Sequence, residues 1–444
     1  MRAPLCYYCV SSDMSGKQQG RLSLRRNFSW ILVGSMVENG SKWAMFILLT
    51  KLTSPEEVGS FSLALAVTTP ITILTQLQLR AALITDAGEE HPFGAYRALR
   101  LISVVVSMLI VGAVGVGLYG VGYTGALIAM VGLSQVMTSL RDIWMGLSQK
   151  QERMDVTATG NMIDGFASLV LFAALLVAIG DVLWAVGGMV VARLATLFFY
   201  DMPHARATMD DGQSDALVWH RPALVRLFWK VLPLGLTTAL VSLNSNIPQY
   251  FNEEYLGREN VAFFAAIFYF VLAAWLVVAS LGRAASPRLA RLYRSADRRR
   301  FSALLWKLLA ISAGLGLVCI LGFALFGEHF LRIAYSEEYA AHADILIVLM
   351  FAGGLRFINA TLGVAMTAAR YFKIQPLVYG AVTVTTVLAC WEFIPAYGLL
   401  GAAWAAVAVA MVNVLCSAVV VVHVVLTMPA GAAPSPPAAP RDLP

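Results

Sequence analysis

Long apolar runs recur along almost the whole chain, and their length restricts what it can fold into. A helix needs roughly 20 mainly apolar residues to cross a bilayer. Only 13% of the 444 residues are charged, whereas a soluble domain carries about 25%. The chain is therefore predicted to be an all-α, polytopic membrane protein. Its twelve runs of spanning length are residues 28–50, 59–79, 99–119, 121–140, 161–180, 182–200, 229–250, 261–282, 303–326, 343–366, 376–395 and 398–427.

Two stretches exceed the length of one span and must turn, one near Gly120 and one near Asp181. The N-terminal segment, residues 1–27, has no apolar stretch of signal-peptide length, so the first span is expected to be retained. Met14 opens a more typical lead-in to that span than Met1, and either could be the true start. The Pro/Ala-rich tail, residues 428–444, is predicted to be disordered.

Basic residues are distributed unevenly between the two faces of the twelve-span arrangement. Of the 32 Lys and Arg residues, 26 fall on the face that carries both termini and three on the opposite face. Because Lys and Arg accumulate in cytoplasmic loops, both termini are predicted to be cytoplasmic. The net charge of +6 then needs no nucleic acid partner, since the basic run at residues 283–300 would face anionic membrane lipids.

An internal repeat with an offset near 200 residues predicts two similar halves. The matched segments are "KLTSPEEVGSFSLALA" with "YLGRENVAFFAAIFYF", "LRAAL" with "GRAAS", and "GLSQKQERM" with "AMTAARYFK". Each half then holds six helices, residues 28–200 and residues 229–427, joined by a cytoplasmic linker at residues 201–228. Parallel repeats of this kind place a binding site between the halves, near the membrane midplane.

The stretch "LTSPEEVGSFSLALA", followed by a span that ends in "LQLRAALI", resembles the start of the bacterial polysaccharide (O-antigen type) flippases. These belong to the multidrug/oligosaccharidyl-lipid/polysaccharide exporter superfamily. The similarity extends over roughly residues 25–425 and is most specific in residues 50–85. It implies a transporter of two six-helix bundles around a central cavity, which moves an undecaprenyl-diphosphate-linked oligosaccharide to the outer leaflet.

Ionisable groups inside the spans are few and costly, so they usually face a cavity or a partner. Glu38 and Lys42 lie four residues apart on one face of the first span, in the order that favours an ion pair. One interpretation is a pair that neutralises itself. The other is that Lys42 meets a substrate phosphate and Glu38 takes up a proton or cation during transport. Asp164 and Glu392 are further candidates for ion coupling.

Arg193 and Arg356 are the other two cations inside the spans. Guanidinium groups bind phosphate oxygens in a bidentate manner, which would suit a lipid diphosphate. For Arg193 the alternatives are snorkelling toward the membrane surface and a helix–helix hydrogen bond. Arg80 and Arg283 occupy equivalent places in the two halves and could receive the diphosphate at the inner mouth, although positive-inside anchoring also explains them.

Neutral polar groups suited to sugar hydroxyls cluster in the first, seventh and tenth spans. The candidates for cavity or sugar contacts are Asn39, Trp43, Asn244, Asn246, Gln249 and Asn359. Pro233 and Pro248 permit bends in the seventh span. A bend there could help the transporter to switch access.

Enzymatic signatures are missing from the sequence. It contains no P-loop motif, so ATP is not the direct driving force, and no cofactor or metal is expected. The pair Cys6 and Cys9 has no second Cys or His pair nearby, which argues against a zinc site. The loops are too short for a soluble catalytic domain.

The sequence therefore favours a flippase for lipid-linked oligosaccharide that works by ion-coupled alternating access in the bacterial inner membrane. A multidrug/cation antiporter of the same fold is the nearest alternative, and a membrane-embedded glycan polymerase or ligase is a more distant one. The expected partners are the lipid-linked substrate, membrane lipids, a coupling proton or sodium ion, and a glycan polymerase.

Overall fold

The computed structural model describes residues 24–86, 90–209, 214–369, 371 and 374–428, and no strand occurs among them. The all-α prediction is confirmed. Cys6, Cys9 and residues 429–444 of the Pro/Ala-rich tail lie outside the described residues. The helices are α1 (Leu24–Leu52), α2 (Pro55–Gln76), α3 (Leu79–Thr85), α4 (Phe93–Tyr119), α5 (Tyr123–Lys150), α6 (Met154–Ile179), α7 (Val182–Thr196), the π-helix η1 (Leu197–Asp201), α8 (Met202–Arg206), α9 (Arg221–Leu256), α10 (Arg258–Arg294), α11 (Arg298–Ala334), α12 (Glu337–Ala340), α13 (Ala343–Ala368) and α14 (Gln375–Thr427).

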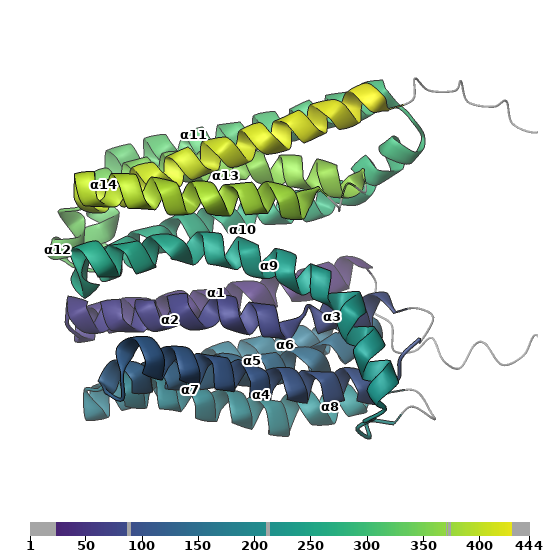
Figure 1. Cartoon of the computed structure of the whole chain (residues 1–444), viewed down its shortest axis with the longest axis horizontal. Coiled ribbons are helices and arrows are strands. Elements are labelled where there is room, and N and C mark those ends of the chain that lie inside the picture. Colours follow the sequence, from purple (N-terminus) through teal and green to yellow (C-terminus); the bar gives the residue numbers. More distant parts are fainter. Residues whose placement is uncertain (1–23, 87–89, 210–213, 370, 372–373, 429–444) are drawn as a thin grey trace, which may run out of the picture. The chain divides into compact units, whose positions relative to one another are not determined.

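Ten helical stretches of the described chain are long and apolar enough to cross a membrane. Helix α1, which carries Glu38 and Lys42, is not one of them, and α14 is counted once although its backbone breaks at Gly398 (φ 59°). Figure 1 shows the two arms of α14 running antiparallel. With α1 and the second arm of α14 included, the described helices give the twelve spans that the sequence predicts.

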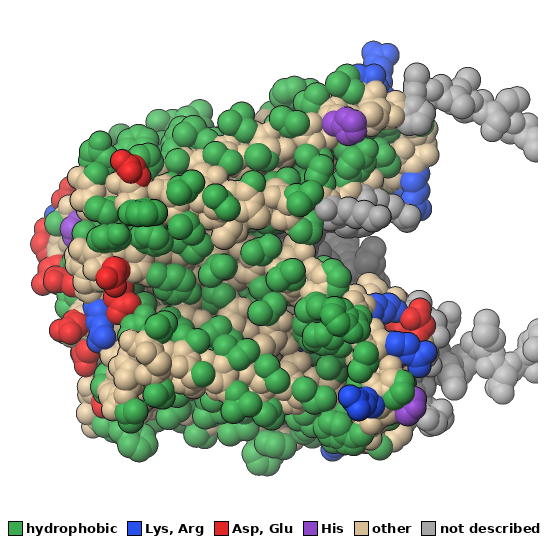
Figure 2. All heavy atoms as spheres, in the orientation of Figure 1, with side chains coloured by type: hydrophobic (Ala, Val, Ile, Leu, Met, Phe, Trp, Pro, Cys, Tyr) green, Lys and Arg blue, Asp and Glu red, His purple; other side chains and the backbone are tan. Residues whose placement is uncertain are grey.

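Packing divides the chain into two compact units. Unit 1 comprises Met1–Met45, Thr75–Ala113 and Gly132–Leu234, and unit 2 comprises Phe46–Leu74, Val114–Val131 and Gly235–Pro444. Each has its own apolar core, built around residues such as Tyr96 and Trp144 in unit 1 and Phe301 and Leu305 in unit 2. Figure 2 shows that, on the face it draws, apolar side chains cover the flanks of the helices and charged side chains gather at helix ends. That distribution suits a protein whose flanks contact lipid.

The "LTSPEEV" stretch forms the start of α2 through a capping box. The Ser54 backbone N–H donates to Glu57 Oε2 (3.0 Å), and the Glu57 N–H donates in return to Ser54 Oγ (3.4 Å). Pro55 occupies the first helical position, where its missing N–H costs nothing. Val58 follows and is fully buried. The most specific part of the family resemblance is therefore a local signal that stops one span and begins the next.

The predicted turn near Asp181 is built from two adjacent caps. Gly180 ends α6 in the left-handed region (φ 73°), where a residue without Cβ is unstrained. The Asp181 carboxylate then accepts a hydrogen bond from the Leu183 N–H (2.7 Å) and starts α7. The helices continue into the predicted linker on both sides, to Arg206 and from Arg221. Hydropathy marks only the apolar part of a span, so it cannot show how far a charged helix end extends.

Residues 214–220, which precede α9, make several contacts with other residues of unit 1. Asp215 pairs with Arg206 (2.8 Å) and Arg97 (3.5 Å), and the Arg97 guanidinium lies 4.6 Å from the centre of the Trp144 ring. The Val218 N–H donates to the Gly94 carbonyl (3.2 Å). Burial raises the pKa of Asp215, but hydrogen bonds and charge from the two arginines outweigh burial and hold it below its usual value. Residues 214–220 thus pack as part of unit 1.

Helices α11 and α13 approach closely in unit 2, where Gly316 faces Gly354. A Cβ on Gly316 would lie 2.9 Å from the Gly354 Cα, closer than atoms of this kind can pack. Small residues at a crossing let two helix backbones come together in a membrane protein. Residue 316 must therefore be glycine for α11 and α13 to pack this closely.

We expect Gly316→Ala to destabilise the protein by about 1–3 kcal/mol, because the added methyl overpacks the crossing. Gly314→Ala is the matched control, since a Cβ on Gly314 of the same helix meets nothing within 4 Å. The measurement is the thermal unfolding midpoint of the purified protein in detergent. Equal midpoints for the two variants would contradict the close approach.

Candidate functional site

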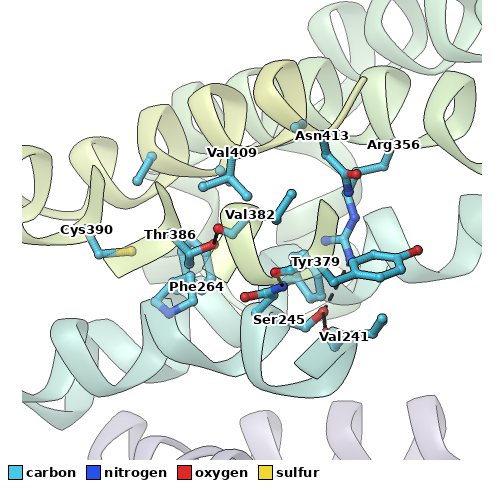
Figure 3. Close-up of a pocket in the computed structure, with 16 residues that line it drawn as sticks. Val241, Ser245, Phe264, Arg356, Tyr379, Val382, Thr386, Cys390, Val409 and Asn413 are labelled. Atoms are coloured by element: carbon cyan, nitrogen blue, oxygen red, sulfur yellow. Dashed lines mark hydrogen bonds between the residues drawn. The ribbon is translucent and has the colours of Figure 1, made fainter. Parts of the chain in front are cut away.

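A pocket of about 90 Å³ lies within unit 2 (Figure 3). Helices α9, α10, α13 and both arms of α14 contribute to its walls. Its lining residues are Val241, Asn244, Ser245, Pro248, Phe264, Phe268, Arg356, Tyr379, Val382, Thr386, Cys390, Ala405, Ala406, Val409, Ala410 and Asn413. None of these described residues is acidic, and one is basic.

Arg356 brings the positive charge to this pocket from α13. Its Nη2 donates to Ser245 Oγ (3.3 Å), and its Cζ lies 5.4 Å from the centre of the Phe268 ring. In the described part of the chain, Arg356 makes no ion pair with a carboxylate within 4.0 Å. A half-buried guanidinium has five N–H donors to satisfy, so the remaining donors are available to an anion in the pocket.

Two amide groups supply hydrogen-bond acceptors to the same pocket. Asn244 donates from Nδ2 to the Tyr379 carbonyl (3.4 Å), and its Oδ1 is buried with no hydrogen-bond partner. Asn413 Oδ1 is also buried and unpaired. A buried acceptor without a donor is costly. Arg356 and these two amides together therefore suit a ligand that is anionic and also carries donor groups.

The other polar candidates of spans seven to eleven lie in different surroundings. Asn246 donates to the Ser242 carbonyl of its own helix (2.8 Å), and Gln249 is half-buried with Oε1 unpaired. Asn359 lines a second cavity of unit 2. Glu392 is exposed on α14. The side chain of Arg283 lies outside the described residues.

A buried ion-pair cluster occupies unit 1. Arg141, on α5, pairs with Asp164 of α6 (2.7 Å) and with Asp201 at the end of η1 (2.5 Å). It also donates to the Gly160 carbonyl (2.9 Å). The side chains of all three charged residues are at most 6% exposed. One cation thus holds two carboxylates from two other elements, while Asp164 Oδ1 has no hydrogen-bond partner.

Arg193 is buried on α7 and is occupied by a neighbouring helix. Its Nη1 donates to the Ser134 carbonyl (2.7 Å) and to Ser134 Oγ (2.6 Å) on α5, while its Nε has no partner. The geometry is the helix–helix hydrogen bond, one of the two alternatives that the sequence offers for this residue, and not snorkelling. Arg193 is not a lining residue of the Arg356 pocket.

Glu38 and Lys42 form the ion pair predicted from their spacing, with Nζ and Oε1 2.6 Å apart. Their side chains are 23% and 43% exposed, respectively. Asn39 donates to the Ser35 carbonyl of its own helix (2.8 Å), and Trp43 is half-buried. This polar face of α1 is much less buried than the Arg141 cluster.

Arg80 lies in α3 and is held by α5. Its Nη1 pairs with Asp142 Oδ1 (3.0 Å), and its Nε and Nη2 both donate to Gln149 Oε1 (3.1 and 2.8 Å). Asp142 also pairs with Arg100, which is almost fully buried. A substrate phosphate at Arg80 would have to replace these contacts.

Arg141 is not among the site residues predicted from the sequence, because the apolar run ends at residue 140 and hydropathy places the arginine in a cytoplasmic connection. The structure corrects this, since α5 continues to Lys150 and Arg141 is 1% exposed. A signal was present, because Ser134, Arg141 and Ser148 recur every seven residues and all three are buried. Seven residues are about two helical turns, so these side chains share one face. The described residues contain no group of three His, Cys, Asp or Glu that could hold a metal ion.

A family model described as "Polysaccharide biosynthesis protein" matches residues 24–293. The chain belongs to this family. Among curated relatives, the capsular polysaccharide biosynthesis protein CapF of Staphylococcus aureus is 25% identical over 384 residues, which cover 85% of this chain and 94% of CapF. The resemblance inferred from residues 50–85 is thereby confirmed.

Solved structures show the fold of this polysaccharide biosynthesis protein. An inward-facing multidrug resistance MATE family transporter of the MOP superfamily has a TM-score of 0.72 at 12% identity, covering 90% of this chain and 99% of that chain. The lipid II flippase MurJ, in an inward closed conformation, has a TM-score of 0.68 at 14% identity, covering 89% of each chain. The chain is a multi-pass membrane protein with the fold of MOP-superfamily transporters.

We expect Arg141→Met to destabilise the protein by about 3–5 kcal/mol, because it leaves two carboxylates buried without their cation. Arg153→Met is the control, since Arg153 pairs with Asp155 near the surface and such a pair contributes at most about 1 kcal/mol. The thermal midpoint and yield in detergent check this. If Arg141→Met unfolds at the same temperature as Arg153→Met, the cluster does not hold unit 1 together.

Proposed function

We propose that this chain moves an undecaprenyl-diphosphate-linked oligosaccharide from the inner to the outer leaflet of the bacterial cytoplasmic membrane. The cargo would serve surface polysaccharide synthesis as O-antigen, capsule or exopolysaccharide. The observation that supports this most is Arg356, a cation without an acidic partner in the described structure, which lines a pocket without acidic side chains. Family membership and a transporter fold add to it.

Arg356 would bind the diphosphate. The pocket offers guanidinium N–H donors to phosphate oxygens, and its partly buried position strengthens the attraction. Lys42, Arg80, Arg193 and Arg283 stay predictions as further diphosphate ligands. The first three already have partners, so each would have to exchange a contact when the cargo passes.

The polarity of the pocket also favours a flippase over the nearest alternative, a multidrug/cation antiporter. A multidrug or cation antiporter needs carboxylates where its cargo binds, and the described lining of this pocket has none. Among the described residues of unit 2, no contact favours a glycan polymerase or ligase. The proposal has two further parts. A glycan polymerase takes over the cargo at the outer leaflet, and both termini of the chain are cytoplasmic.

We expect Arg356→Ala to reduce surface polysaccharide at least about tenfold, because a hydrogen bond to a charged group contributes about 1.5–3 kcal/mol. Arg356→Lys should retain part of the activity. The measurement is surface polysaccharide per amount of membrane-inserted protein in a strain whose own copy is deleted. Arg332→Ala is the control, as Arg332 pairs with Glu328 and Glu337 in exposed positions. Normal polysaccharide with Arg356→Ala at equal protein level would refute the diphosphate role.

Ion coupling is the second part of the proposal, and Asp164 is the carboxylate that we place in it. Its Oδ1 is buried and unpaired, while Gly165 beside it packs against α1: a Cβ there would lie 3.1 Å from both Ser41 Oγ and Glu38 Cα. A proton or sodium ion at Asp164 would compete with Arg141 and so alter the packing of α5 and α6. Glu38 stays a candidate in the same region.

We expect Asp164→Asn to remove the response of transport to an imposed proton or sodium gradient, because an amide keeps the shape but not the charge. The control is Glu392→Gln, which changes an exposed carboxylate and should leave the response intact. Transport is followed in membrane vesicles with and without each gradient. A gradient response retained by Asp164→Asn would exclude this residue from coupling.

A further inference from the structure

A second and larger cavity lies in unit 2 next to the Arg356 pocket, and Tyr379 lines both. Its volume is about 390 Å³, within the range of about 300–1,000 Å³ that small-molecule sites occupy. Helices α10, α13 and α14 form its walls. The cavity therefore offers space for a ligand group attached to one that occupies the Arg356 pocket.

The walls of this cavity combine one large aromatic ring with neutral polar groups. Trp275 supplies the ring, Asn359 and Gln375 supply amides, and Ser286 and Ser417 supply hydroxyls. None of the described lining residues is charged. A sugar ring has apolar faces and a rim of hydroxyls, so a flat aromatic surface and a few neutral hydrogen-bonding groups match its chemistry.

Asn359 links the two cavities along one helix face. It follows Arg356 by three residues on α13, and residues at that spacing are neighbours on a helix surface. Its Oδ1 is buried and has no hydrogen-bond partner, which is unfavourable unless a ligand supplies a donor. Across the cavity, Gln375 is held by a hydrogen bond from its Nε2 to Thr367 Oγ1 (3.2 Å). A hydroxyl beside a phosphate at Arg356 would satisfy the Asn359 oxygen.

We propose that this cavity is a saccharide subsite that takes the sugar residue attached directly to the diphosphate, and that it selects an uncharged sugar. The inference rests on the proposed function, because a diphosphate at Arg356 sets where the first sugar begins. A uronic acid would bring a carboxylate against a described lining that offers no cation. Burying such a charge without a partner is costly, so an acidic first sugar gains nothing from this subsite.

Gly363 provides a direct test, because it lines the cavity and a Cβ there would meet nothing within 4 Å. Gly363→Leu should fill the space reserved for the sugar. Asn359→Leu is a second variant of nearly the same shape as the native side chain. Gly314→Leu is the control, since Gly314 lies on an exposed face of α11 with nothing within 4 Å of a Cβ.

The experiment measures the Kd of the full chain in lipid nanodiscs for three probes: undecaprenyl diphosphate, and the same lipid carrying glucose or glucuronic acid. The native protein should bind the glucose-bearing lipid at least about tenfold more tightly than the bare one, which corresponds to one or two hydrogen bonds. Gly363→Leu and Asn359→Leu should remove that difference and leave the affinity for the bare lipid unchanged. Gly314→Leu should behave as the native protein does.

Each contrary result has a separate meaning. Equal affinity of the native protein for the bare and glucose-bearing lipids, or equal weakening of both by Gly363→Leu, would overturn the subsite and leave the proposed function standing. Tighter binding of the glucuronate-bearing lipid than of the glucose-bearing one would overturn the selection of an uncharged sugar. Failure of the native protein to bind any of the three lipids would refute the proposed function itself.

Discussion

The ion pairs of Arg141 with Asp164 and Asp201 are the interaction on which unit 1 depends. An ion inside a membrane-spanning bundle is unfavourable unless it is paired, and here one guanidinium serves two carboxylates and a carbonyl. The three charges come from α5, α6 and η1, so the full cluster forms only when all three elements are packed. Removing Arg141 would leave two buried carboxylates without a cation, whereas removing either carboxylate would leave the other paired with Arg141.

The half-buried cation of unit 2, Arg356, has different surroundings. Arg356 has a hydroxyl and an aromatic ring beside it but no carboxylate within the described structure. Arg141 and Arg356 both lie in long apolar helices, but only Arg141 is paired with carboxylates in the described structure. A paired cation contributes to packing, whereas one whose charge is left uncompensated beside a cavity is free to meet an anionic ligand. This contrast is the main reason to place cargo binding at Arg356 and not at Arg141.

Most of the fold could be predicted because it follows from local rules. The length of the apolar runs sets the spans, and caps such as Ser54 with Glu57, or Gly180 with Asp181, set where they begin and end. The Glu38–Lys42 ion pair could also be predicted from the sequence, because the two residues are four positions apart in one helix. The sequence named Asp164 but not its pairing with Arg141, nor the pairing of Arg141 with Asp201, because these contacts join different elements and a hydropathy profile cannot reveal a contact between helices. For the same reason the sequence could name Arg356 but could not show that Asn413 shares its pocket.

The order in which the Arg141 cluster is synthesised has a consequence for biogenesis. Asp201 follows Arg141 by 60 residues, which a ribosome adds in about 3–12 s at typical elongation rates. During that interval α5 has left the ribosome and carries Arg141, while its second partner, Asp201, has not yet been synthesised. A hydrated position near the insertion machinery is less costly for α5 than lipid until the carboxylates follow, because an unpaired cation in the bilayer is unfavourable. Unit 1 would enter the bilayer as a group of helices, with Arg141 marking the helix that has to wait.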